Sequence, residues 1–196
     1  MAEMLSEEGL DLLFRNARTY NGYIDRPVTE DQLHAIWDLM KFGPTSANML
    51  PARIIWCVSR ESKDRLAALA SGTNGPKIQA APVTAIIGMD LEFYEHLPRL
   101  FPHADARSWF AGNDKLIEVS AFRNSSLQGG YFIMAARALG LDTGPMSGFD
   151  NDAVDAAFFA GSKVKSNFIC TVGYGDPATI FDRSPRPDFG DFNKIV

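Results

Sequence analysis

The stretch NDKLIEVSAFRNSSLQGGYFIMAARAL, residues 113–139, carries almost no helix breakers apart from Gly129-Gly130. Gly140 follows it directly, at a position where glycine commonly ends a helix. The stretch therefore predicts one helix of roughly seven turns, long enough to span a domain. The two internal glycines each cost about 1 kcal/mol relative to alanine. They indicate either close approach of another backbone, such as a helix of a second subunit, or fraying of the helix.

Three shorter helices are predicted before this one, and one is predicted after it. Ser6 can cap the first, whose apolar residues follow helical spacing at Leu10, Leu13, Phe14 and Ala17. A capping box at residues 29–32 (TEDQ) opens the second, with apolar positions at Leu33, Ile36, Trp37 and Met40. Both are expected to be amphipathic helices of the core. Further helices are expected at about 62–70 and, after the cap Asp150, at about 150–161.

Three apolar runs predict strands. They are residues 53–58 (RIIWCV), 82–88 (PVTAIIG) and 167–174 (NFICTVGY). Strands that are apolar on both faces belong to a sheet covered by helices on both sides. Because no linker, repeat or low-complexity tract interrupts the chain, residues 1–196 are expected to form a single α+β domain.

The composition narrows the class of protein. The 196 residues are 46% hydrophobic and 22% charged, which is an ordinary composition for one substantial core. The net charge of −5, with 19 basic residues scattered among 24 acidic ones, argues against a nucleic-acid partner. No apolar run approaches the roughly 20 residues that cross a bilayer, and the acidic N-terminus lacks the order of a signal peptide. A cytoplasmic protein without a membrane partner is expected.

The sequence lacks the usual motifs of metal sites and of enzymes that use a nucleophilic side chain. Cys57 and Cys170 sit in apolar runs, and the three histidines are scattered, so we expect neither a disulfide nor a metal. The only G-x-G, residues 173–175, runs into Asp176-Pro177 instead of a glycine-rich helix start. Nucleophile elbow, P-loop and H-E-x-x-H motifs are missing as well. This elimination leaves cofactor chemistry, with a flavin as the candidate.

A loop dense in small polar groups follows the second predicted helix. Residues 41–53 read KFGPTSANMLPAR, and Pro44 and Pro51 limit the backbone at either end. Thr45, Ser46 and Asn48 offer short donors and acceptors between them. Such a loop suits a ligand, although by itself it also fits a well-capped turn.

An aromatic excursion at about residues 91–112 precedes the long helix. It is interrupted by two prolines and interleaves its aromatic residues with Arg99, His103 and Arg107. The aromatic residues could simply pack the core, but the cationic side chains would be costly to bury without anionic partners. The segment is therefore expected to act as a lid that meets an acidic substrate.

Five segments in register resemble the FMN-dependent nitroreductase family. The loop at 44–51 resembles its P-(S/T)-S-x-N-x-x-P element, residues 17–23 (ARTYNGY) its R-R-S-x-R-x-F opening, and residues 74–77 (NGPK) its N-x-x-K element. Residues 145–150 (PMSGFD) resemble the P-x-x-G-F-D loop, and Arg186 takes the place of a C-terminal basic residue. Each motif alone also fits a surface arginine, a lysine turn or a Gly-Phe corner. Together they cover residues 10–186.

The resemblance implies a fold, a cofactor and an assembly. It implies a nitroreductase-like α+β fold, with a central mixed, mostly antiparallel sheet flanked by helices on both faces and a long central helix. It also implies a homodimer with FMN at the subunit interface, so that the 44–48 loop serves the neighbour's flavin. The implied cofactor-binding residues are Arg18, Thr19, Asn21, Pro44, Thr45, Ser46, Asn48, Asn74, Lys77, Pro145, Met146, Ser147, Gly148 and Arg186.

Within the family, four segments resemble the malonic semialdehyde reductase branch of bacterial pyrimidine utilisation. They are residues 43–48, 100–110, 122–126 and 138–150. The resemblance implies hydride transfer from NADPH or NADH through flavin N5 to the aldehyde carbon of 3-oxopropanoate, in a ping-pong reaction that yields 3-hydroxypropanoate in pyrimidine degradation. Lys77 would then tune the flavin. The substrate-binding candidates are Arg107, His103 and Arg123.

Departures from the wider family leave other functions open. Asn21 stands where a second basic residue is common, Ser147 where many members have Glu, and Ser184 where a lysine is frequent. They weaken nitroaromatic reduction more than flavin binding. The alternatives are a broad-specificity nitro or quinone reductase and a non-catalytic flavin-binding protein.

Overall fold

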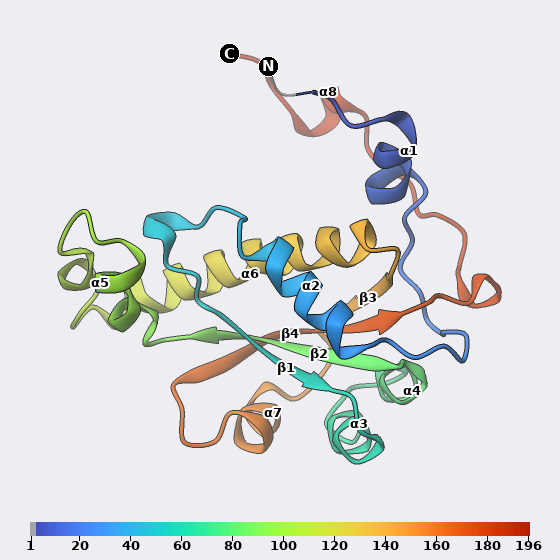
Figure 1. Ribbon diagram of the computed structural model, residues 1–196, viewed down its shortest axis with the longest axis horizontal. Coiled ribbons are helices and arrows are strands. Elements are labelled where there is room, and N and C mark those ends of the chain that lie inside the picture. Colours follow the sequence, from blue (N-terminus) through green and yellow to red (C-terminus); the bar gives the residue numbers. More distant parts are fainter. Residues whose placement is uncertain (1–2) are drawn as a thin grey trace.

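A four-stranded antiparallel sheet forms the centre of the protein. The computed structural model describes residues 3–196. The strands are β1 (Ala52–Cys57), β2 (Val83–Asp90), β3 (Asp142–Met146) and β4 (Val164–Gly173), in the spatial order β1-β2-β4-β3 (Figure 1). All three pairings are antiparallel. The parallel pairing expected of a mixed sheet is limited to an isolated bridge between Thr19 and Thr143.

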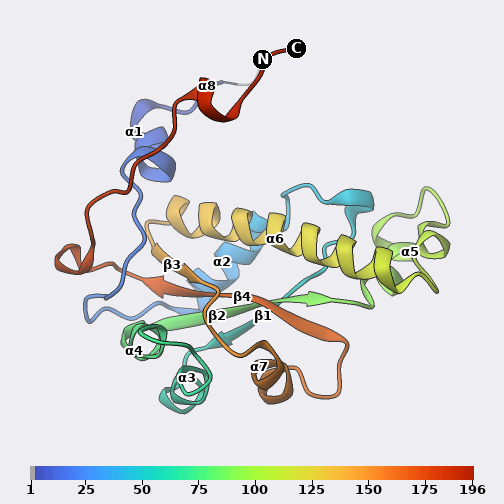
Figure 2. The same ribbon diagram turned by 180° about the vertical axis from the view of Figure 1, so that it is seen from behind.

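Helices cover both faces of this sheet. The long helix α6 (Asp114–Ala138) and α2 (Glu30–Met40) lie on one face, and α3 (Arg60–Ala67), α4 (Asn74–Ala80) and α7 (Asn151–Phe158) lie on the other (Figures 1 and 2). The predicted long helix is confirmed. Its N-cap Asn113 accepts from the Leu116 N–H, and Gly140 ends it with φ of +74°. The predicted capping box of α2 is also present.

The remaining elements are short. They are α1 (Glu7–Leu10) with a π turn at Asp11–Arg15, α5 (Leu97–Leu100), α8 (Phe189–Phe192) and 3-10 turns at Ser46–Asn48, Phe93–His96, Ala106–Trp109 and Pro177–Thr179. Strand β3, which contains Gly144 and Pro145, has no counterpart in the sequence-based expectations. Neither has helix α4, which begins with the predicted N-x-x-K segment, nor have the short helices α5 and α8.

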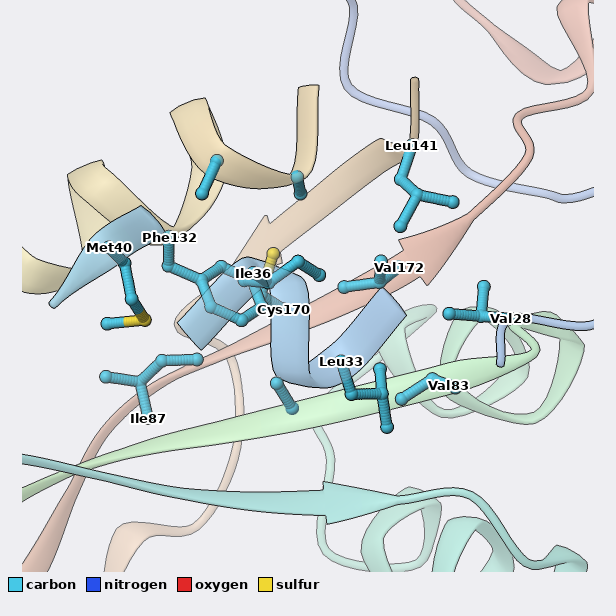
Figure 3. Close-up of a cluster of buried hydrophobic side chains, with 13 residues drawn as sticks. Val28, Leu33, Ile36, Met40, Val83, Ile87, Phe132, Leu141, Cys170 and Val172 are labelled. Atoms are coloured by element: carbon cyan, nitrogen blue, oxygen red, sulfur yellow. The ribbon is translucent and has the colours of Figure 1, made fainter. Parts of the chain in front are cut away.

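Two hydrophobic clusters sit on opposite faces of the sheet. Alternate residues of β2 point to opposite sides, so that Ile87 joins the cluster under α2 and α6 while Ile86 joins the one under α3 and α7. Figure 3 shows the first cluster, in which Ile36 and Phe132 meet the sheet. A third cluster lies between the start of α6 and residues 93–110. The prediction of a sheet covered on both sides is confirmed.

The two cysteines are buried on opposite sides of the sheet. Cys57 belongs to the cluster under α3 and Cys170 to the cluster under α6, and both are free thiols. Burial raises the pKa of Cys57 to about 11 and that of Cys170 to about 12. The sheet keeps the two sulfurs apart, which rules out a disulfide between them.

No helix within residues 3–196 is long and apolar enough to cross a membrane. Within the same residues, no group of three or more His, Cys, Asp or Glu side chains gathers where it could hold a metal ion.

The N-terminal helix departs from the expectation of a core helix. Helix α1 and the following π turn contain no buried residue, and Phe14 is 55% exposed. The C-terminal residues 181–196 are exposed as well. Helices α1 and α8 both lie away from the sheet, on the same side of the molecule (Figures 1 and 2). Leu13 borders an apolar groove with residues of α2 and α6 but is only half-buried there, so the amphipathic pattern did not place this segment in the core.

Gly129 allows close packing against an aromatic ring. A Cβ at this position would lie 2.3 Å from the Phe168 ring of β4, so the neighbour is a side chain of the same chain and not another backbone. Gly130 meets no atom of the chain within 4 Å. The expected approach of a second subunit therefore stays a prediction for Gly130 and is wrong for Gly129.

The α2 cap offers a test of the fold. The Thr29 hydroxyl accepts from the Gln32 N–H, whereas Thr73 occupies the N-cap position of α4 without a side-chain bond. Thr29→Ala should lower the free energy of unfolding by about 1 kcal/mol in urea denaturation, and Thr73→Ala should change it by less than about 0.5 kcal/mol. Equal losses for the two variants would contradict this account of the cap.

Candidate functional site

A polar cavity of about 370 Å³ lies between the 17–21 segment, the end of α6 and the C-terminal residues 181–186. Four arginines from three parts of the chain line it: Arg18, Arg137, Arg183 and Arg186. Thr19 and Asn21 lie on the same wall. The structure therefore brings together four residues that were predicted to bind the cofactor: Arg18, Thr19, Asn21 and Arg186. It adds Arg137 and Arg183, which were not predicted.

The four guanidinium groups of this arginine cavity have no carboxylate partner within residues 3–196. Their hydrogen bonds go to main-chain carbonyls instead: Arg18 to Phe181, Arg137 to Leu13, Arg183 to Arg15 and Ala17, and Arg186 to Ser184 and Pro185. Asp182 is the one acidic residue that lines the cavity, so four arginines leave an excess of positive charge there, and like charges repel one another. In a chain of net charge −5 such a group is suited to an anion that supplies the missing negative charge.

Arg137 is the most enclosed member of this group. Its Nη1 donates to the Leu13 carbonyl at 2.9 Å, while its buried Nε finds no partner within the described residues. Burial lowers the pKa of Arg137, and the neighbouring charge of Arg183 lowers it further. A buried donor without an acceptor is costly, so the cavity favours a ligand that accepts hydrogen bonds.

Sequence reasoning missed Arg137 and Arg183. A basic residue in the last turn of a helix is the ordinary complement of the helix dipole, so Arg137 carries no special signal. Arg183 stands in an irregular tail whose path the sequence does not specify. Only the return of that tail to the 15–17 carbonyls places its guanidinium in the cavity.

Strand β3 positions the 17–21 segment beside the cavity. The Tyr20 N–H donates to the Thr143 carbonyl at 3.3 Å, and a Cβ at Gly144 would lie 2.8 Å from the Tyr20 carbonyl oxygen. The approach of the two backbones therefore requires glycine at position 144. Asn21 donates to the Thr179 carbonyl at 2.9 Å, which ties this segment to the turn before the tail.

A second cluster forms where α4 meets the 145–148 segment. Asn74 Nδ2 donates to the Gly148 carbonyl at 3.0 Å, and a Cβ at Gly148 would lie 2.7 Å from that nitrogen. The two predicted elements, N-x-x-K and P-x-x-G-F-D, therefore contact each other. Pro145 and Ser147 are exposed, and Met146 and Lys77 are half-buried. The side chain of Lys77 forms no hydrogen bond or ion pair with residues 3–196, so its ammonium group is free to meet a ligand.

The loop at 44–48 lies at the other end of the molecule. Figures 1 and 2 both place its 3-10 turn next to α5, away from α4 and from the arginine cavity. Asn48 Nδ2 donates to the Leu100 carbonyl at 2.8 Å, and Thr45 Oγ1 accepts from the Leu50 N–H. Ser46 is exposed, and its hydroxyl forms no bond within the described residues. One chain does not bring this loop to the other predicted cofactor residues.

The backbone of the loop is strained. Ala47, Asn48 and Leu50 have φ of 48°, 50° and 40°, and within residues 3–196 they are the only non-glycine residues with positive φ. Such conformations cost of order 1–3 kcal/mol each and persist where the surroundings enforce them.

The predicted lid at 91–112 divides into an inner and an outer side. Phe93, Leu97 and Phe110 pack inward on the start of α6, so the alternative of core packing holds for them. Phe101 and Trp109 form an edge-to-face pair at the outer side, with Trp109 51% exposed.

The predicted substrate residues do not meet in one chain. Arg107 forms two hydrogen bonds of 2.7 Å to Glu95, which raises the pKa of Arg107 and lowers that of Glu95. His103 lies edge-on to Phe101, with ring centroids 5.5 Å apart. Arg123 is exposed on α6 and borders an apolar groove instead of the lid. Their role in substrate binding stays a prediction.

That apolar groove runs along the outer face of α6. It encloses about 970 Å³ and is lined by the exposed side chains of Val119, Phe122 and Leu127 and by the half-buried Met134. Apolar patches of this extent commonly mark a surface that another protein covers.

Comparison with known proteins identifies the family. Residues 15–174 match the model of the nitroreductase family. A provisionally named NADH dehydrogenase/NAD(P)H nitroreductase of Burkholderia lata is 63% identical over 191 residues, covering 97% of this chain and 98% of that protein.

Solved structures share the fold. A provisionally named nitroreductase, YdfN, of Bacillus subtilis superposes with a TM-score of 0.88 at 20% identity, over 97% of this chain and 100% of that one. A provisionally named nitroreductase of Exiguobacterium sibiricum, solved in complex with FMN, does so with a TM-score of 0.85 at 18% identity over the full length of both chains. The predicted nitroreductase-like fold is confirmed, and the chain belongs to the nitroreductase family.

Proposed function

We propose that this protein is an FMN-dependent NAD(P)H oxidoreductase that reduces malonic semialdehyde, 3-oxopropanoate, to 3-hydroxypropanoate. The observation that carries the cofactor assignment is the arginine cavity, in which four arginines outnumber the single acidic residue, Asp182, and form no ion pair within residues 3–196. The names of the relatives support the reductant, since the Burkholderia lata protein is named for NAD(P)H and the Exiguobacterium sibiricum structure contains FMN.

The residues of the cavity fit the phosphate of FMN. A phosphate monoester presents three strong acceptor oxygens and nearly two negative charges, which match the free donors of the cavity. Arg18, Arg137 and Arg186 would hold it from three sides, with the hydroxyl of Thr19 as a further donor. When bound, FMN supplies the hydride chemistry, accepting hydride from NAD(P)H and passing it to the aldehyde carbon.

The cluster at α4 would hold the flavin ring. Asn74 and the backbone of 145–148 form one wall, fixed by the bond between Asn74 and Gly148. The free ammonium group of Lys77 would stabilise negative charge that develops on the pyrimidine side of the ring. Asn21 stands where a second basic residue is common in the family, but it carries no charge and donates to the Thr179 carbonyl. Lys77 would therefore serve as the main cation near the flavin ring.

A homodimer would complete the site. The apolar groove on α6 and the exposed arms formed by α1 and residues 181–196 offer apolar surface that one chain leaves uncovered. We therefore expect the 44–48 loop of one subunit to approach the flavin held by the other. A cytoplasmic location is expected with NAD(P)H as the co-substrate.

The lid carries the argument for an acidic substrate. Arg107 would bind the carboxylate of 3-oxopropanoate, with His103 and Arg123 as further candidates, and the substrate carboxylate would replace Glu95 as the partner of Arg107.

A second candidate function is that of a broad-specificity nitro or quinone reductase. The exposed Trp109 and the half-buried Phe101 favour it, because an aromatic wall suits a flat ring.

The first prediction tests the cofactor site. Arg137→Gln should raise the dissociation constant for FMN about tenfold or more, because charge-assisted hydrogen bonds are worth roughly 1.5–3 kcal/mol and 1.4 kcal/mol is a factor of ten. The dissociation constant for riboflavin, which lacks the phosphate, should not change. Arg60→Gln, at an exposed arginine paired with Asp64, is the control. Equal losses for FMN and riboflavin, or FAD as the flavin that co-purifies, would contradict the assignment.

The second prediction tests the substrate. Steady-state kinetics of the FMN-loaded protein should give a higher kcat/KM for 3-oxopropanoate than for a nitroaromatic compound or a quinone. Arg107→Ala should raise the KM for 3-oxopropanoate about tenfold and leave quinone reduction unchanged. Glu95→Gln, which frees the guanidinium group, should not raise that KM. Preference for the quinone, with no effect of Arg107→Ala, would favour the second candidate function.

A further inference from the structure

The loop at 43–52 is held by three side chains of one helix. Asn124, Gln128 and Tyr131 follow one another at spacings of four and three residues, so they share a face of α6. Asn124 Oδ1 accepts from the Ser46 N–H at 2.9 Å, Gln128 Oε1 accepts from the Ala52 N–H at 2.8 Å, and the Tyr131 hydroxyl donates to the Pro44 carbonyl at 2.9 Å. These three bonds bracket the strained part of the loop.

The side chains that hold the loop are themselves fixed. Asn124 is 2% exposed and donates from Nδ2 to the Ser120 carbonyl at 2.9 Å, so its oxygen is aimed at the loop. Gln128 is fully buried, and its Nε2 has no partner within the described residues. A buried amide that satisfies only its acceptor is costly for the core alone. Its bond to the loop is the one function that the structure shows for it.

The helix and the loop also fit closely. A Cβ at Gly43 would lie 2.0 Å from the Tyr131 ring, so only glycine allows the loop to leave α2 along this path. The positive φ values at 47, 48 and 50 then turn the chain back toward β1. In that conformation Met49 is buried while Ser46 is exposed, with its hydroxyl unbonded in residues 3–196.

We propose that Asn124 and Gln128 are positioning residues that hold the 44–52 loop in its strained conformation, so that the Ser46 hydroxyl is presented to the flavin. The proposal rests on the proposed function, since it requires that the loop meets FMN. Neither residue touches the cofactor. Each acts through a main-chain N–H of the loop, one at each end of the strained segment.

The test combines flavin affinity with hydrogen exchange. Asn124→Leu and Gln128→Met remove the accepting oxygens and keep much of the side-chain volume. Each should raise the FMN dissociation constant, measured by quenching of flavin fluorescence, about tenfold. In the protein without flavin, Asn124→Leu should speed exchange of the Ser46 amide and Gln128→Met that of the Ala52 amide.

The matched control is Ser125→Ala on the same helix. Ser125 is fully buried but bonds to Phe122 and Asn167, not to the loop. It should change neither FMN affinity nor the exchange of the loop amides by more than about twofold. If Asn124→Leu does not fold, Gln128→Met at the other end of the loop decides the matter.

A double variant separates positioning from a general loss of structure. If Asn124 acts through Ser46, then Ser46→Ala combined with Asn124→Leu should bind FMN no more weakly than Asn124→Leu alone. The proposal would be overturned if the two substitutions multiplied their effects on the FMN dissociation constant. It would also be overturned if hydrogen exchange of the loop amides did not change in Asn124→Leu and Gln128→Met. Failure of the wild-type protein to bind FMN would refute the proposed function, whereas normal FMN binding by wild type and both single variants would overturn this inference alone.

Discussion

The packing of α6 on the sheet is the constraint on which the rest of the molecule depends. The helix buries Phe132, Ala135 and Ala136 against the sheet, and its 25 residues span about 37 Å. Its last turn carries Arg137 into the arginine cavity, and its middle carries Asn124 and Gln128 to the strained loop. Both regions are therefore attached to one helix.

This arrangement explains why one chain contains two parts of a site. Asn124 and Arg137 are 13 residues apart, which is about 20 Å along the helix axis. The arginine cavity and the α4 cluster adjoin β3, whereas the loop lies beside α5 (Figures 1 and 2). In the proposed homodimer, the loop of one subunit supplements the arginine cavity of the other. The exposed groove on α6 between the two regions then gives the subunits a surface on which to meet.

The arginine cavity and the lid use charge in different ways. The four arginines of the cavity form no ion pair within residues 3–196 and outnumber Asp182, the one acidic residue of the lining, so their charge is available to a ligand. Arg107 is held by Glu95, and a substrate carboxylate would have to replace that partner. An exposed pair of this kind is worth little by itself. The exchange of one carboxylate for another therefore costs little, which is compatible with a lid that binds a small acid transiently.

Local patterns allowed the helices and buried strands to be predicted from the sequence. The α6 stretch, the Thr29 capping box and the apolar runs of β1, β2 and β4 carry their signals within a few residues. Strand β3 could not be predicted in this way, because Gly144 and Pro145 disfavour a strand and only pairing with β4 defines it.

The same limit applies to the candidate site. The segments that hold Arg18, Asn74 and Gly148 were recognisable by their motifs, and the structure places Asn74 against Gly148. Arg137 could not be recognised as a site residue from the sequence, because nothing local distinguishes it from a basic residue that complements the helix dipole. The pairing of Arg107 with Glu95 and the support of the loop by Asn124 and Gln128 join residues that are distant in sequence. Such contacts become visible only when the chain has been folded.

Subunit mixing tests the central claim, that each flavin site takes its arginine cavity from one chain and its loop from the other. One variant carries Arg137→Gln and Arg186→Gln, the second carries Ser46→Ala and Asn124→Leu, and the two bear different affinity tags. In the mixed dimer, one site combines both defects and the other combines an intact cavity with an intact loop. FMN titration of the purified mixed dimer should therefore show one site per dimer with wild-type affinity. Binding no tighter than in either parent dimer would contradict the account.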